Sequence, residues 1–83
     1  RPSRLLLNID QVSDDAPLEV SLVDDAEQPL PGFEPVRVAQ PGLRVPVVFA
    51  EPNVPAGKRF RVRIRWPEGE ANPRFYALYF LAN

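Results

Sequence analysis

Carboxylate side chains are the most obvious candidates for catalysis or metal binding in this chain. Two clusters of them occur, Asp14/Asp15 and Asp24/Asp25/Glu27. Paired carboxylic acids can hydrolyse a glycoside, and carboxylate oxygens suit Ca²⁺. Both clusters, however, lie in stretches that predict turns, where Asp is frequent because its side chain hydrogen-bonds the nearby backbone. No loop has the ligand spacing of an EF-hand. We therefore interpret both clusters as turn formers and expect no metal and no cofactor.

The residue types of nucleophilic catalysis are largely missing. The sequence contains no His and no Cys, and it has neither a serine-elbow motif nor a phosphate-cradling glycine-rich loop. A hydrolase triad needs a nucleophile beside a base, and zinc sites rely on His or Cys. The sequence therefore predicts that this chain, taken alone, is not an enzyme.

The stretch KRFRVRIRW, Lys58 to Trp66, places a basic residue at every second position. Because alternate residues of a β-strand point to opposite faces, one face would hold the predicted core residues Phe60, Val62 and Ile64, followed by Trp66. The other face would hold four arginines: Arg59, Arg61, Arg63 and Arg65. Three explanations stay open for this face. It could be solvated and paired with neighbouring acids, docked against another domain, or bound to an acidic polymer.

The charge balance argues against nucleic acid as the partner. Lys and Arg number 10 against 11 Asp and Glu, which gives a net charge of -1. A nucleic-acid binder is usually basic overall, and no aromatic residue alternates with the arginines to stack on bases. No apolar run approaches the roughly 20 residues of a membrane span. We expect neither nucleic acid nor a membrane as a partner.

The elements that must position these residues are predicted to be β-strands. Eleven prolines and four glycines interrupt the chain, so no long segment keeps a helical apolar period. Six apolar runs remain, at residues 4–9, 18–23, 34–40, 43–50, 58–66 and 74–81. This pattern predicts a small antiparallel β-sandwich, Ig-like or jelly-roll-like, with six to eight short strands in a single domain over residues 1–83. Since position 1 is not Met, we expect the domain to be excised or processed from a larger chain.

Turn residues and proline sharpen this prediction. Residues 24–28 predict a five-residue hairpin loop, and Pro31-Gly32 predicts a turn. Pro46 cannot donate to a strand ladder, so its strand should lie at a sheet edge or be bulged there. Strict alternation in that strand would put Leu43 on one face with Val45, Val47 and Phe49.

The last run, residues 74–81, is apolar on both faces. This favours a central strand or a strand that another domain covers. Its tyrosines, together with two other aromatic residues, are candidates for a docking or ligand-binding surface: Phe33, Trp66, Tyr76 and Tyr79. For Trp66 two interpretations stay open, a plug at the end of the core and an exposed platform for a sugar ring.

Several motifs occur in an order that resembles a known family. These are PLPGF at Pro29–Phe33, then GLRVPVVF, AGKRFRVRIRW and FYALYF. Together with LLLNI and LEVSLVD, they resemble the small C-terminal β-sandwich domain of bacterial glycoside hydrolases of the five-bladed-propeller, family 32-like type. The resemblance spans roughly Leu5 to Phe80, and its motifs are structural.

The resemblance implies a function outside catalysis, because in such proteins the catalytic residues belong to the other domain. The chain would be a non-catalytic accessory module of a larger bacterial, exported (periplasmic or extracellular), carbohydrate-active protein. It would pack on the catalytic domain or assist carbohydrate binding. The alternative is a stand-alone module that recognises a protein or peptide through an edge strand.

Overall fold

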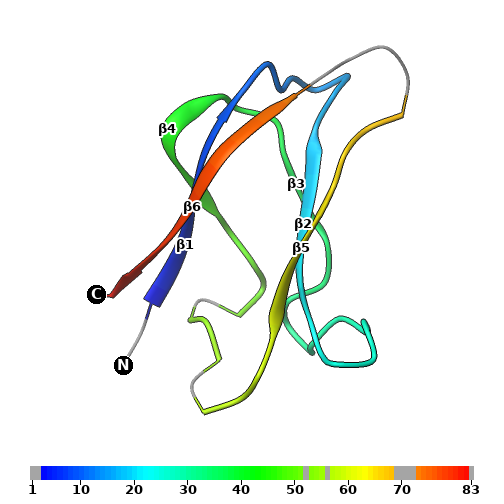
Figure 1. The fold of residues 1–83 in the computed structure, drawn as a ribbon, viewed down its shortest axis with the longest axis vertical. Helices are drawn as coiled ribbons and strands as arrows, with labels where there is room; N and C mark the ends of the chain where they lie inside the picture. Colours follow the sequence, from blue (N-terminus) through cyan, green and yellow to red (C-terminus); the bar gives the residue numbers. More distant parts are fainter. Residues whose placement is uncertain (1–2, 52, 56, 69–72, 83) are drawn as a thin grey trace.

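Six antiparallel β-strands in two sheets make up the fold (Figure 1). The computed structural model describes residues 3–51, 53–55, 57–68 and 73–82, and no helix occurs among them. The strands are β1 (Ser3–Asp10), β2 (Leu18–Val23), β3 (Val36–Val38), β4 (Gly42–Val47), β5 (Arg61–Arg65) and β6 (Arg74–Ala82). The sheet orders are β4-β1-β6 and β3-β2-β5. The predicted fold class, a small all-β sandwich with at least six strands, is confirmed.

The core lies between the two central strands, β1 and β2. Their inward side chains are at most 2% exposed, and they belong to one apolar cluster: Leu5, Leu7, Ile9, Leu18, Val20 and Leu22. Period-2 alternation explains this arrangement, since every second residue of each central strand points to the opposite sheet.

Phe33 is part of this core, so its proposed role as a surface aromatic was wrong. Its side chain is 4% exposed, and its ring packs edge-on against Phe49 at a centroid distance of 5.3 Å. The turn before it delivers the ring inward. Phe33 N donates to Leu30 O at 2.9 Å, and Gly32 adopts φ 88°, the value that the third position of a type II turn requires.

The hairpin loop between β2 and the Pro29 bridge forms as predicted over residues 24–28. Asp24 Oδ1 accepts hydrogen bonds from the backbone N–H groups of Ala26 and Gln28, at 2.8 and 3.0 Å. The Asp24 N–H donates to Gln28 O at 2.9 Å and closes the loop. The Asp side chain therefore stabilises the turn, as the composition of this segment predicted.

The predicted positions of β4 and β6 within their sheet can be compared with the observed ones. β4 lies at a sheet edge, which confirms the expectation drawn from Pro46. β6 also lies at an edge, so the first of the two alternatives, a central strand, was wrong, and the second, a strand that another domain covers, stays a prediction. It is apolar on both faces for another reason. One face packs on the core through Phe75 and Leu78, and the opposite face exposes large apolar side chains.

Two register shifts face the same point of β1, one on each side. Along β4 the pairing jumps from Leu7↔Val45 to Ile9↔Gly42, and along β6 it jumps from Asn8↔Ala77 to Ile9↔Phe75. Each jump inserts one extra residue into the outer strand, which breaks the alternation of its side chains. Leu43 is consequently 76% exposed. The prediction that Leu43 shares an inward face with Val45, Val47 and Phe49 was wrong for this reason, although the other three residues do pack on or in the core.

The two sides of the sandwich are closed to different degrees. On the side of β3 and β4, the inward side chains Val38, Val47 and Phe49 are 5–8% exposed. On the side of β5 and β6, Phe60, Val62 and Ile64 pack against the core but remain only half-buried. Phe60 meets Phe80 edge-on at 5.9 Å, yet Phe80 is 45% exposed. Phe60, Val62 and Ile64 therefore point into the core as predicted, but they are less buried than the inward residues of the central strands.

Candidate functional site

The predicted arginine face exists, on the outside of the β3-β2-β5 sheet. The burial of β5 alternates residue by residue, with Arg61, Arg63 and Arg65 exposed and Val62 and Ile64 turned inward. Arg59 precedes the strand and is also exposed. Across the sheet, Arg65 lies opposite Glu19 of β2. The alternation of residue types in this segment was therefore sufficient to assign its two faces.

The outward residues of β2 lie buried beneath this face. Ser21 and Val23 alternate with the core residues Val20 and Leu22, yet they are only 3% and 2% exposed. Their cross-strand partners are Arg63 and Arg61. The long aliphatic stems of arginine can cover such positions while the guanidinium groups stay in water.

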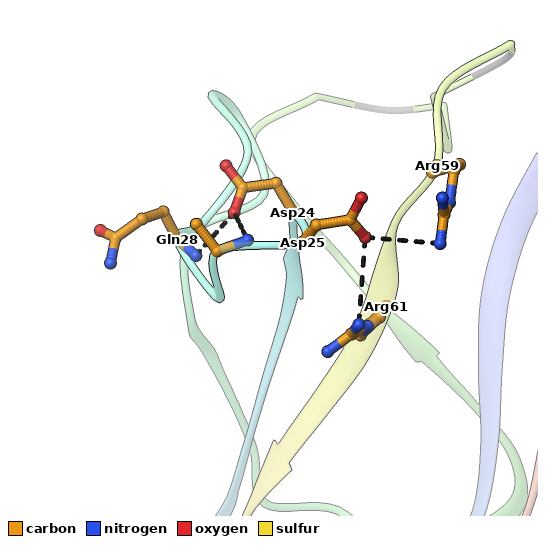
Figure 2. A network of polar contacts seen from close by, with 6 residues as sticks. Asp24, Asp25, Gln28, Arg59 and Arg61 are labelled. Atoms are coloured by element: carbon orange, nitrogen blue, oxygen red, sulfur yellow. Dashed lines mark hydrogen bonds and ion pairs between the residues drawn. The ribbon is translucent and has the colours of Figure 1, made fainter.

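One carboxylate pairs with the end of the arginine row. Asp25 Oδ1 lies 3.7 Å from Arg59 Nη2 and 4.0 Å from Arg61 Nη2, as Figure 2 shows. The three side chains are 60–85% exposed, so water and salt screen the attraction and its contribution to stability is small. In the described chain the arginine face is thus an exposed strand face with a loop acid at one end.

The acidic clusters take structural roles. Asp24 caps its own loop and Asp25 pairs with the arginines (Figure 2). In the other cluster, the backbone oxygen of Asp14 accepts a hydrogen bond of 2.6 Å from Arg37 Nη2, which ties the β1–β2 connection to β3. Among the described residues, no group of three or more acidic side chains lies close enough to hold a metal ion.

A second candidate surface is apolar and covers the outside of the β4-β1-β6 sheet. Tyr79 and Leu81 alternate with the inward residues of β6 and are 44% and 43% exposed. Leu6 lies between Pro46 and Tyr79 in the pairing and points away from the core, yet it is only 5% exposed. The neighbouring apolar side chains therefore cover the centre of this face themselves.

The two bulges shape one end of the apolar face. Their extra residues, Leu43 of β4 and Tyr76 of β6, are 76% and 56% exposed. Both line one shallow hollow of about 320 Å³, to which Asn8 and Asp10 add polar groups. Bulges re-aim side chains in this way at sheet edges and binding sites.

Trp66 follows β5 directly and lies at the end of the sandwich. Its indole N–H donates to Pro73 O at 2.9 Å, and its ring meets Phe75 of β6 edge-on at 6.4 Å. These contacts anchor it between the sheets, while 47% of the residue stays exposed beside a hollow that Glu19, Arg65 and Glu68 also line. Trp66 is therefore held at the end of the sandwich by Pro73 and Phe75 while about half of its surface stays exposed.

The sequence-predicted site residues do not form a single site. The arginines lie on one sheet, Tyr76 and Tyr79 lie on the other, and Trp66 lies at the end between them. Sequence reasoning missed Leu43 and Leu81 as members of the apolar face. The doubly apolar pattern of β6 was the available signal for Leu81, whereas nothing in the sequence indicated the bulge that turns Leu43 outward.

Comparisons with known proteins gave no match, either among protein-family models, among curated proteins or among solved structures. The family resemblance drawn from the motifs therefore stays a prediction. Within the part of the chain that the structure describes, no helix is long and apolar enough to cross a membrane.

Proposed function

We propose that this chain is a non-catalytic accessory module of a larger, carbohydrate-active protein, and that the outer face of the β4-β1-β6 sheet packs against a catalytic domain of that protein. The observation that supports this proposal most is the gathering of exposed large apolar residues on one sheet face: Leu43, Tyr76, Tyr79 and Leu81. Contiguous exposed apolar surface is characteristic of interaction sites, whereas single exposed apolar residues are normal.

The arginine face, on the outside of the β3-β2-β5 sheet, supports the choice of the other sheet face as the docking surface, because the two faces differ in character. Its arginines are exposed, and Arg63 and Arg61 pair across the strands with Ser21 and Val23 of β2, whose side chains are buried. A domain whose second sheet face exposes large apolar side chains, beside Arg4 and Asn8 of β1, can pack that face on a neighbour and keep its arginine face in water. The engagement of Asp24 and Asp25 in loop structure supports a role without catalysis.

The experiment starts from the gene, because the reading frame upstream of Arg1 should encode the catalytic domain. In that full-length protein, Leu81→Ser and Tyr79→Ser should loosen the contact between the domains and expose their connection to limited proteolysis. Arg63→Ser on the opposite face is the matched control and should leave the cleavage pattern unchanged. A reading frame that begins near Arg1, or equal cleavage of all three variants, would overturn the proposal.

Assistance in carbohydrate binding is the second candidate, and the hollow beside Trp66 supports it. A half-exposed indole flanked by Glu19, Arg65 and Glu68 combines an apolar platform with polar groups that can bind hydroxyls. The chain has a single Trp, so its fluorescence reports on this site alone. Titration with soluble polysaccharides should shift the emission, and Glu68→Gln should weaken the response. An unchanged spectrum with every polysaccharide would exclude this role for Trp66.

A further inference from the structure

The four sheet edges of this sandwich are not equally protected against pairing with another strand. An unprotected edge presents free backbone N–H and C=O groups, and proteins block such edges with proline, charge or very short strands. β3 has three residues, β4 contains Pro46, and β5 carries Arg at every second position. β6 has nine residues without Pro, Lys or acid, and its one charged residue is Arg74, at its start. In the described structure β6 pairs with β1 only.

The side of the sandwich next to this edge is also the open one. Phe80 faces inward, opposite Leu5 and against Phe60, and still is 45% exposed. Val62 and Ile64 of β5 are half-buried, like Val36 and Val45 on the β3–β4 side, but that side also has the almost completely covered Val38, Val47 and Phe49. The unpaired backbone edge of β6 and the exposed ring of Phe80 thus lie on the same side of the sandwich.

We propose that β6 pairs antiparallel with β6 of a second copy of this chain about a two-fold axis, which joins the two β4-β1-β6 sheets into one six-stranded sheet. An antiparallel strand pair places side chains of the same face opposite each other. With Tyr79 opposite its counterpart on the axis, Leu78 lies opposite Phe80, and Ala77 lies opposite Leu81. Each pair then shares a face, because Leu78 and Phe80 point inward and the others outward.

The chemistry of β6 favours a second copy as the partner. In this register every opposed pair is apolar or aromatic, and Arg74 lies beyond the paired segment, so no like charges meet. Leu78 of each copy would cover the exposed ring of Phe80 of the other. Because Pro46 blocks the far edge of each joined sheet, the assembly closes as a dimer and does not extend into a fibre. This inference uses the edge of the sheet, whereas the proposed accessory role uses its face, although the side chains of Tyr79 and Leu81 belong to both.

Sedimentation velocity of the full chain over a wide concentration range tests the proposal. The wild type should form a dimer. Tyr79→Lys and Tyr79→Glu should each weaken dimerisation by about tenfold or more, since like charges meet on the axis and an aromatic pair is lost. An equimolar mixture of the two variants should restore a dimer, because Lys then faces Glu. Leu43→Lys, the matched control on the far edge, should dimerise like the wild type.

A second measurement decides the question even if a Tyr79 variant does not fold. In wild-type protein, hydrogen exchange of β6 amides should become faster on dilution, whereas that of β4 amides should not change. A wild type that stays monomeric at all concentrations, a Tyr79→Lys variant that dimerises undiminished, or β6 amides insensitive to dilution would each overturn the proposal. The first of these outcomes would leave the accessory role untouched.

Discussion

Each of the two sheets has three strands, and the sheets differ in the side chains that lie beside the outward residues of the central strand. In each sheet the central strand buries its inward side chains and also some of its outward ones, Leu6 in β1 and Ser21 and Val23 in β2. Over Leu6 the cover is apolar, from Pro46 and Tyr79. Over Val23 and Ser21 the neighbours are Arg61 and Arg63. A small sandwich can therefore thicken its core with two kinds of outer layer, and the docking that we propose uses the apolar one.

The largest expected effect is the loss of stability when a buried leucine of a central strand, β1 or β2, is truncated, compared with a residue of the edge strand β5. Leu7→Ala and Leu22→Ala, both at fully buried sites, should each lower the free energy of unfolding by about 3–5 kcal/mol. Ile64→Ala, in half-buried β5, should cost clearly less. Urea denaturation monitored by circular dichroism measures all three. Similar losses for Ile64 and Leu22 would contradict this prediction and would mean that Ile64 is as buried in solution as the centre of the core.

An intermediate effect is expected on the apolar outer layer. Leu6→Ala should cost about 2 kcal/mol, near the lower end for buried leucine, because the outer side chains can settle over the gap. The same urea titration applies, with Leu43→Ala as the control at an exposed site, where we expect a change within about 0.5 kcal/mol. Equal effects at Leu6 and Leu43 would show that Tyr79 and Pro46 do not cover Leu6.

The smallest effect is expected on the arginine layer. Arg61→Ala and Arg63→Ala should each cost about 1 kcal/mol or less, since their charges are solvated and only the stems pack. Arg63→Met, which keeps a long apolar stem without the charge, should recover most of the loss. If the Met variant is as unstable as the Ala variant, the charge and not the stem stabilises this face.

The same contrast explains how far the sequence could predict the structure. Where alternation runs without interruption, as in β5, residue types alone assigned the faces correctly. Turns were also predictable, because Asp24 and Pro31-Gly32 act through their own backbone neighbours. These are local interactions, and a single sequence contains all that determines them.

Predictions failed where distant segments decide the outcome. The extra residue at Leu43 turns outward because of its pairing with β1, more than thirty positions away along the chain. The edge position of β6 depends on which strand lies beside it, and the burial of Phe33 depends on Phe49. For the candidate site, the residue types were identified, but their division between two sheets followed only from the topology.

The position of β1 has a consequence for the order in which this fold can form. β1 comes first in the chain but is the centre of its sheet, and its partners are β4 and β6, with Ser3 opposite Ala82 (Figure 1). During synthesis the apolar run Leu5–Leu7 therefore emerges long before either of its neighbours exists. The β2–β3 pair, in contrast, is complete as soon as Val38 is made, because only the connection over residues 24–35 separates its strands. The final ladder joins the two ends of the described chain, so completion of the sandwich must wait for the last strand, the arrangement that makes β-folds slow to form.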